Sequence, residues 1–212
     1  MIKKIIYIFG IIFILLIAGA GYFAYKTYIN PDISGYENLK EPQISTKEDQ
    51  KVITYSAEGD PDTVAGEGIA KLYQVYFSIP EVDKTSLVPP RGRWEFITEG
   101  DSSNLRGELA LPVPDSVESV SDDNIEVKTW EYGKVAEILH VGPYDKEEPT
   151  IEKLMNFIDE MGYETVGRQE EEYLRGPTFI GEGNPDEYAT IIRYRIQEKT
   201  ESVESADVES EE

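Results

Sequence analysis

A pattern of predicted elements that occurs twice is the feature that most constrains the fold. Residues 51–61 alternate between apolar and polar side chains as a strand does, and a helical stripe follows at residues 69–76. Two further strands are predicted at 91–98 and 105–114, with a turn between them at 99–104. The first half of the chain therefore reads strand, helix, strand, strand.

The second half follows the same order. It begins with strands at 125–133 and 134–142, continues into a helical stripe at 151–158, and ends with strands at 163–174 and 187–196. Two such halves predict an α+β fold, in which two pseudo-repeated strand-helix-strand-strand modules share antiparallel sheet and each carries one helix. The natural cleft of such a fold lies where the halves meet.

The turn before the second helix has a distinct sequence. Gly142 and Pro143 end the preceding strand. Asp145 and Glu148 have the spacing of a capping box, and Gly162 is placed to end the helix. We therefore expect Asp145 to cap this helix.

The N-terminal residues 5–25 carry no charge and could cross a membrane. At about 1.5 Å per residue, a helix of this length spans roughly 31 Å, close to the hydrocarbon thickness of a bilayer. Lys3 and Lys4 favour a cytoplasmic N-terminus and an exported remainder. The long apolar run favours a transmembrane anchor at residues 1–25, and a signal peptide cleaved after the small residues 18–20 is the alternative. Either interpretation places the C-terminal domain outside the cytoplasm, in the periplasm or at the cell surface.

The rest of the chain divides into a linker, a domain and a tail. Residues 26–47 show little periodicity and contain Pro31 and Pro42, which predicts a linker. The domain is expected at 48–197. Residues 198–212 carry seven acidic side chains, one lysine and no aromatic, so we expect a disordered acidic tail.

Composition excludes several classes of function. The chain has no cysteine and one histidine, so thiol chemistry, disulfides and multi-histidine metal centres are impossible, and neither a metal site nor a cofactor is expected. A formal charge of −22 would repel nucleic acid, whose binding depends on cationic side chains. Glycine loops that hold phosphates and the motifs of serine hydrolases and zinc proteases are also absent from the sequence.

One predicted strand carries the first candidate for chemistry. Alternation along 168–174 places Gln169, Glu171 and Tyr173 on one face and Glu170 and Glu172 on the other. Glu171 could face water on a solvated strand surface, which composition alone favours. It could instead point into a cavity, where a desolvated carboxylate attracts a cation or holds a proton. Periodicity cannot choose between these two positions.

The histidine and the aromatic side chains are further candidates. His140 shares a face with apolar residues, a position more typical of a structural histidine than of a ligand-binding one. Fourteen tyrosines and two tryptophans offer side chains that can line a ligand site. Tyr73 and Tyr76 share the helical stripe, and Trp94 lies on a strand. We treat these three as candidate walls of a cleft, with core packing as the alternative.

Three stretches of the second half carry a family resemblance. They are AEILHVGPYDK at 136–146, EEYLRGP at 171–177 and NPDEYATIIRYRI at 184–196. In order and spacing they resemble the GyrI-like domain, which also occurs as the effector-binding domain of multidrug-sensing bacterial transcription regulators. The resemblance is most specific over 125–196, whereas residues 50–120 agree mainly in the pattern of elements.

The resemblance implies a site as well as a fold. It implies two modules related by a pseudo-twofold axis, an aromatic-lined cleft between them, and Glu171 inside that cleft in contact with organic, often cationic, ligands. Tyr144 would lie near the rim, with a purely structural turn as the alternative for this residue. Similar regulators carry a DNA-binding helix-turn-helix ahead of the domain. Here the apolar segment stands in that place, which argues against transcriptional control.

Three functions are compatible with these observations. The first is a membrane-tethered binding domain that senses or sequesters a small organic molecule, cationic or amphipathic, through Glu171, Tyr173, Tyr144, His140, Trp94, Tyr73 and Tyr76. The second is a hydrolase of reactive small molecules, since some similar proteins hydrolyse strained electrophiles with an acidic residue and a tyrosine; Glu171 would be its catalytic acid or base. The third is a structural adaptor of the cell envelope. The first is the expected function, and its partners would be a small organic ligand and the membrane.

Overall fold

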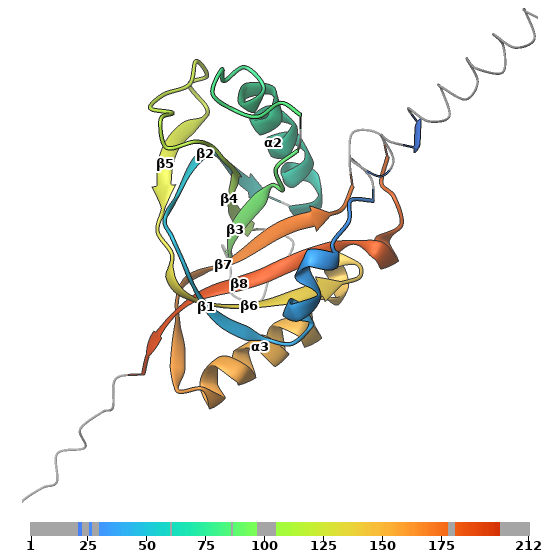
Figure 1. Ribbon diagram of the computed structural model, residues 1–212, viewed down its shortest axis with the longest axis vertical. Helices are drawn as coiled ribbons and strands as arrows, with labels where there is room; N and C mark the ends of the chain where they lie inside the picture. The colour runs from blue at the N-terminus through green and yellow to red at the C-terminus, as the bar shows by residue number, and fades with distance from the viewer. Residues whose placement is uncertain are drawn as a thin grey trace, which may run out of the picture.

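Eight strands form one antiparallel sheet in the computed structural model (Figure 1), which describes residues 21, 22, 26, 30–59, 61–85, 87–96, 105–177 and 181–199. The first half contributes β1 (Gln43–Lys47), β2 (Gln50–Gly59), helix α2 (Pro61–Tyr76), β3 (Arg91–Phe96) and β4 (Leu105–Pro112). The second half contributes β5 (Glu126–Trp130), β6 (Gly133–Val141), helix α3 (Glu148–Glu160), β7 (Tyr163–Arg175) and β8 (Ala189–Glu198). In the described part of the chain, the 3₁₀ helices are η2 (Ser34–Lys40), η3 (Tyr144–Lys146) and η4 (Pro185–Glu187).

The strand order shows that the two halves are equivalent. It runs β1-β6-β8-β7-β3-β4-β2-β5. The repeat is β2-α2-β3-β4 in the first half and β6-α3-β7-β8 in the second. From the outside inward, the strands lie in the order β2, β4, β3 in the first repeat and β6, β8, β7 in the second, so β3 and β7 meet at the seam. This mirrored order is what a pseudo-twofold axis through the seam produces. The predicted α+β class and the repeated modules are confirmed.

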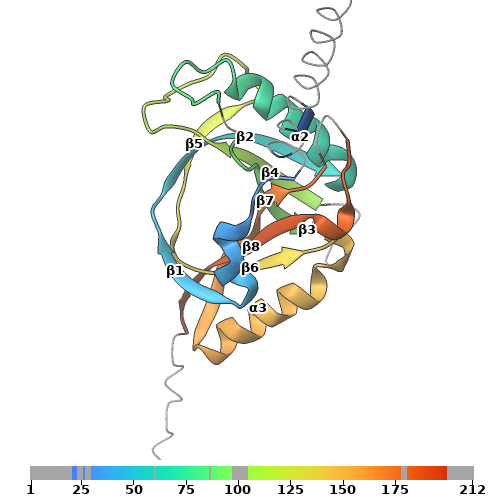
Figure 2. The same cartoon turned by 45° about the vertical axis from the view of Figure 1, so that its right-hand side comes forward.

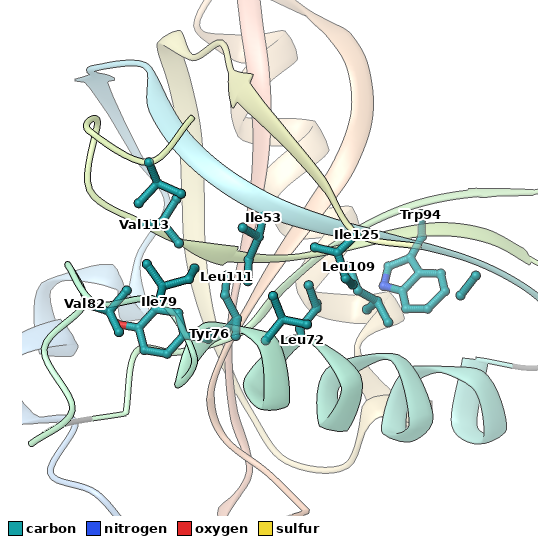
Figure 3. Close-up of a cluster of buried hydrophobic side chains, with 13 residues drawn as sticks. Ile53, Leu72, Tyr76, Ile79, Val82, Trp94, Leu109, Leu111, Val113 and Ile125 are labelled. Atoms are coloured by element: carbon teal, nitrogen blue, oxygen red, sulfur yellow. The ribbon is translucent and has the colours of Figure 1, made fainter. Parts of the chain in front are cut away.

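Both helices cover the same face of the sheet. Helix α2 packs on the first half, in a core that includes Ile53, Leu72 and Leu109, and Trp94 lies at one end of this core (Figure 3). Helix α3 packs on the second half, in a smaller core around Ile138, Leu154 and Ile192. Cross-strand register places Trp94 opposite Gln169, and Glu171 opposite Ile192, so both cores lie on one side.

The opposite face of the sheet carries a row of charges as well as two smaller hydrophobic clusters, one that includes Leu139 and Ile191 and one that includes Val52 and Trp130. At one level the directly paired residues alternate in sign across five strands: Glu108, Arg93, Glu170, Arg193 and Glu137. Arg193 is 2% exposed and bonds to Glu137, Glu170 and Glu172 at 2.8, 2.6 and 3.1 Å. We call this row of five residues, from Glu108 to Glu137, the ion ladder.

Two long arches, one formed by β1 and β2 and the other by β5 and β6, partly cover the ion ladder. β1 runs on into β2, and β5 into β6, yet β1 pairs with β6 and β5 with β2 (Figure 2). Tyr132, in the second arch, donates to Glu170 Oε1 at 2.7 Å, and Arg93 stacks on Trp130 at 3.9 Å from the ring centre. A cavity of about 320 Å³ remains on this face, beside the ladder and the 166–168 segment of β7.

Some boundaries differ from those that the sequence predicted. The expected linker 26–47 contains η2 and β1, and β1 belongs to the sheet. β1 is too short to show a clear repeating pattern, and its partner β6 is about 90 residues away in sequence. Local patterns therefore could not predict it. The expected capping box is wrong: α3 has Glu147 as its N-cap without a side-chain hydrogen bond, since the turn η3 takes up Asp145. Gly162, at φ +79°, does follow the end of the helix.

The predicted ends of the chain lie mostly outside the described residues. β8 continues to Glu198, and the predicted tail from residue 200 onward is not described. The predicted anchor falls almost wholly in residues 1–20 and 23–25, which are also outside. Over the residues that are described, no helix combines the length and the hydrophobicity that a membrane crossing requires.

Candidate ligand-binding site

The candidate site lies at the seam between the halves, on the face that carries the helices. One row of directly paired residues runs Leu109, Gly92, Glu171, Ile192 and Ile138 across five strands. Leu109 belongs to the first core, whereas Ile192 and Ile138 belong to the second. Glu171 is therefore an acidic residue in the gap between two hydrophobic cores, with a glycine on its β3 side.

Hydrogen bonds fix the Glu171 carboxylate. Gln169 Nε2 donates to Oε1 at 2.7 Å, and the Tyr173 hydroxyl donates to Oε2 at 2.7 Å. These donors are the residues two before and two after Glu171, on the same strand face, as the alternation of β7 predicts. The arrangement confirms that Gln169, Glu171 and Tyr173 share a face.

Two aromatic side chains extend this network to both sides. Trp94 Nε1 donates to the Tyr173 hydroxyl at 2.8 Å, and the Tyr194 hydroxyl donates to Gln169 Oε1 at 2.6 Å. Trp94 is 9% exposed, whereas Glu171, Tyr173, Gln169 and Tyr194 keep intermediate exposure. The site thus combines a buried aromatic side chain with four residues of intermediate exposure.

Glycines create the space for Trp94. A Cβ atom on Gly92 would lie 2.7 Å from Trp94 Nε1 and 3.0 Å from the Tyr173 hydroxyl. A Cβ atom on Gly107 would overlap the six-membered ring of the indole. The indole can therefore lie flat across two strands and reach Tyr173 only because both positions lack a side chain.

Tyr144 forms the outer aromatic contact. Its ring meets Tyr173 edge-on with centroids 5.8 Å apart, and it lies at 37° to Tyr188 with centroids 5.2 Å apart. A Cβ atom on Gly176 would overlap the Tyr144 hydroxyl, so Gly176 gives the ring room. η3, which carries Tyr144, follows the Gly142–Pro143 turn, and Gly142 donates its N–H to the carbonyl of Tyr188 at 3.0 Å. The structure thus places Tyr144 next to Tyr173, and its position at the rim of a ligand site stays a prediction.

A second acidic residue lies deeper in the site. Glu147, the N-cap of α3, is 6% exposed, and its Oε1 atom has no hydrogen-bond partner. Burial and the negative charge of Glu171 raise the pKa of Glu147 to about 9, against a smaller opposing effect of the Thr190 hydroxyl. Thr190 is itself fully buried, and its hydroxyl is the hydrogen-bond partner of Glu147. Glu147, Glu171 and Thr190 therefore lie close together.

His140 holds the turn in place. Its Nδ1 lies 2.9 Å from Thr150 Oγ1, and its Nε2 lies 3.3 Å from the Pro143 carbonyl oxygen. Burial lowers the pKa of His140, which favours the neutral ring. Both nitrogens are engaged with the start of α3 and its preceding turn, so the geometry supports a structural role. Contact with a ligand stays a prediction.

Tyr73 and Tyr76 lie away from Glu171. Tyr76 is 3% exposed inside the first core, and Tyr73 packs against that core and donates its hydroxyl to the Val88 carbonyl at 2.7 Å. Tyr73 stacks on Phe77, the residue that follows α2, and Tyr76 meets the same ring edge-on. These contacts explain the two residues as packing, and the structure does not bring them to the Glu171 network.

Burial sets the charge state of the site. It raises the pKa of Glu171, against the hydrogen bonds from Tyr173 and Gln169, which lower it. Burial and the neighbouring Glu171 charge also raise the pKa of Tyr173 well above its usual value. Tyr173 therefore stays a hydrogen-bond donor. Glu147 and Glu171 repel each other when both are ionised, and a bound cation would reduce that repulsion.

Comparison with known proteins decides the family. Residues 40–196 match the GyrI-like small molecule binding domain. The chain belongs to the GyrI-like family. No curated protein matches it significantly.

Solved structures share the fold of this GyrI-like domain. A hydrolase from Listeria innocua is similar with a TM-score of 0.59 and 18% identity, over 74% of this chain and 92% of its own. An uncharacterized conserved protein from Listeria innocua gives 0.64 and 19%, over 82% and 98%. The EcmrR C-terminal domain gives 0.62 and 16%, over 76% and 99%. At these identities the likeness establishes the fold alone.

Two cavities of the described structure lie outside the hydrogen-bond network of Glu171. The larger lies on the ion-ladder face of the sheet. The smaller, about 180 Å³, is lined by Arg175, Gly176, Glu187, Tyr188 and neighbouring residues. Because Gly176 and Tyr188 also contact Tyr144, this smaller cavity adjoins the outer side of the Tyr144 ring. Among the described side chains, no group of three or more acids and histidines is placed to hold a metal ion.

Sequence reasoning missed several members of the site. Gln169 was placed on the face of Glu171 but was not named as a site residue. Tyr194 could have been found, because strand alternation places it on the face of Thr190. Glu147 gave no such signal. It stands in the highly charged stretch DKEEPT, which is typical of an exposed turn.

Proposed function

We propose that this GyrI-like domain binds a small organic cation at the Glu171 site. One observation carries the proposal: the Glu171 carboxylate is held by two hydrogen bonds at 2.7 Å in the gap between two hydrophobic cores, while the residue as a whole keeps intermediate exposure. A carboxylate in reduced dielectric attracts a cation far more strongly than one in water. The faces of Tyr144 and Tyr173 add cation-π attraction for an organic group.

The position of the other charges supports this choice. Arg93 and Arg193 project from the opposite face of the sheet and are paired there with Glu170. They are not available to neutralise Glu171, whose carboxylate accepts hydrogen bonds from the uncharged donors Gln169 and Tyr173. The site therefore keeps a negative potential that selects against anions.

Binding of 4-phenylbutylammonium by full-length protein tests the proposal. Glu171→Gln keeps the shape but removes the charge, and we expect the affinity to fall about tenfold to hundredfold, as for loss of a charged hydrogen bond. Calorimetry measures the affinity, and 4-phenylbutanol is the uncharged comparison ligand. Glu152→Gln on the exposed side of α3 is the matched control and should bind as the wild type does. Equal affinities for the cation in wild type and Glu171→Gln would exclude a charged site.

The Glu171–Tyr173 hydrogen bond favours a second candidate, hydrolysis of a reactive small molecule. A carboxyl with a raised pKa beside a phenol can take and return a proton while water attacks an electrophile. Product formation that is lost in both Glu171→Gln and Tyr173→Phe, with binding retained in Tyr173→Phe, would support an enzyme. If neither binding nor turnover is seen, the envelope adaptor remains.

The proposed placement of this domain is extracytoplasmic, tethered by the apolar residues 5–25. Its support is the uncharged run and the two preceding lysines. A reporter active only after export, fused after residue 212, should be active. A fusion that is active only as a cytoplasmic reporter would overturn the orientation.

A further inference from the structure

The cavity on the ion-ladder face has a chemistry opposite to that of the Glu171 site. Its volume of about 320 Å³ lies at the small end of ligand pockets, which begin at roughly 300 Å³. Four strands supply its charged lining, which consists of Arg93, Glu108, Arg168, Glu170, Arg193 and Arg195. Arginines therefore outnumber acids in this lining, although the chain as a whole has a formal charge of −22.

A bulge in β7 shapes the cavity. Val166 lies opposite Arg195 and Glu170 lies opposite Arg193, so β7 uses four residues where β8 uses two. Gly167 has a φ of +81°, a backbone conformation that favours glycine. Gly167 lines the cavity together with the residue that follows it, Arg168. Bulges redirect side chains and are frequent next to functional sites, and this one presents an arginine to a cavity.

The two acids of the lining are already neutralised. Glu170 forms ion pairs with Arg93 at 2.9 Å and with Arg193 at 2.6 Å. Glu108 forms an ion pair with Lys128. Neither acid is therefore left to balance the remaining arginines of the lining.

Arg195 and Arg168 are these remaining cations. Arg195 donates from Nε to the Tyr132 carbonyl at 3.3 Å and forms no ion pair with a carboxylate of the described residues. Arg168 pairs with Glu95 at 2.8 Å, but the two side chains are 40% and 49% exposed, and an exposed pair is weak enough for a ligand to replace it. A guanidinium presents a planar fork of N–H donors, which matches the oxygens of a carboxylate or phosphate group.

We propose that this cavity binds a small oxyanion, a carboxylate or phosphate group, through Arg195 and Arg168. The site is separate from the Glu171 site, since it lies on the other face of the sheet. Arg93 and Arg193, held by Glu170, form a positively charged inner wall whose position the ion ladder fixes. The limited volume selects a small molecule and excludes a polymer.

Two anions test the site on full-length protein. Benzoate and inorganic phosphate are titrated by calorimetry at pH 8 and constant ionic strength, and benzamide is the uncharged counterpart of benzoate. We expect at least one anion to bind, and benzoate, where it binds, to exceed benzamide in affinity by about tenfold or more. Binding of benzoate alone supports a carboxylate site, and binding of phosphate alone supports a phosphate site. If neither anion binds the wild type, the proposal is refuted.

Substitutions locate the binding. Arg195→Gln and Arg168→Gln each remove one guanidinium and should lower the affinity for the bound anion about tenfold or more. Arg106→Gln is the matched control, because Arg106 is paired with Glu58 in an exposed position outside the cavity lining, and it should bind as the wild type does.

Melting temperatures without ligand show which variants are folded. Arg168 is 40% exposed, so Arg168→Gln decides the test if Arg195→Gln does not fold. A folded Arg195→Gln or Arg168→Gln protein that binds the anion as tightly as Arg106→Gln does would overturn the assignment to this cavity. The result is independent of the Glu171 site, whose own test uses a cation.

Discussion

Arg193 and Glu170 face each other across β8 and β7 and form an ion pair of 2.6 Å in the interior, with side chains 2% and 4% exposed. Arg93 of the first half bonds to the same glutamate at 2.9 Å, so Glu170 joins the two halves on the ion-ladder face. The seam between β3 and β7 has four directly opposed residue pairs, from Arg91–Glu172 to Trp94–Gln169. These ion pairs therefore join the two halves on one face of β7, and Glu171 projects from its other face.

Replacing Arg193 should destabilise the fold strongly. Arg193→Met leaves Glu137, Glu170 and Glu172 buried with fewer cations, and removal of one partner of a buried pair costs about 3–5 kcal/mol. Urea unfolding followed by far-UV circular dichroism measures the loss. The exposed pair of Arg106 and Glu58 is the matched comparison, and Arg106→Met should change stability by less than about 1 kcal/mol. Similar small losses for both variants would mean that the ladder does not hold the seam.

Acid should weaken the same network. Burial alone would raise the pKa of Glu137, but Arg193 and Lys47 outweigh it and hold the pKa below the usual value. Such a carboxylate contributes stability that is present above its unfolded pKa and is lost as the pH falls through its folded pKa. This contribution should therefore disappear below about pH 4, and a Glu137→Gln protein should lack that part of the pH dependence.

Glu147 should have the opposite effect. Its pKa rises from 4.5 to about 9 on folding, so the native state binds an extra proton between these values. The stabilisation is complete below the unfolded pKa and declines as the pH rises toward 9. Glu147→Gln stays neutral at every pH. We expect this variant to equal the wild type near pH 4 and to be more stable by roughly 1–3 kcal/mol at pH 8, by urea unfolding. Parallel pH profiles for the two proteins would show that Glu147 is solvated.

Gly92 should be irreplaceable in the Trp94 contact. In Gly92→Ala the new methyl group would lie 2.7 Å from Trp94 Nε1, and either the indole or Tyr173 must move. Such overpacking costs about 1–3 kcal/mol of stability, and the loss of the Trp94–Tyr173 hydrogen bond should lower ligand affinity as well. Thermal unfolding and calorimetry measure the two effects.

The control for this change is Gly66→Ala on α2. A Cβ atom there meets nothing within 4 Å, and alanine favours a helix by up to about 1 kcal/mol. This variant should be as stable as the wild type or more so, with unchanged ligand affinity. A Gly92→Ala protein that behaves like Gly66→Ala would contradict the close packing of Trp94.

Local patterns in the sequence were sufficient to predict the repeated elements. Alternation and helical spacing act over a few residues, so they located β2, α2, β6 and α3 and placed Gln169, Glu171 and Tyr173 on one face. They could not say which face of β7 is covered, because the answer depends on the packing of α2 and α3 from distant parts of the chain.

Long-range pairings were beyond these patterns. β1 adjoins β2 in sequence but pairs with β6, and β5 adjoins β6 but pairs with β2. The burial of Glu147 is of the same kind, since it follows from the docking of α3 beside Thr190 and Glu171 and not from its charged neighbours in sequence. The site depends most on residues whose environment is assembled from several elements.

The pairing of β1 gives a last prediction, on residues that the sequence assigned to the linker. Replacing Gln43–Lys47 in the full-length chain by a Gly-Ser segment of equal length removes five cross-strand pairs with β6 and leaves the outer edge of β6 uncovered. At about 0.2–1 kcal/mol a pair, the free energy of unfolding should fall by roughly 1–5 kcal/mol. Lys47→Ala is the matched control, because it removes only the ion pair with Glu137 at 3.2 Å and should cost less than about 1 kcal/mol. If the protein with the Gly-Ser segment unfolds at the same urea concentration as Lys47→Ala, β1 acts only as a linker and does not stabilise the sheet.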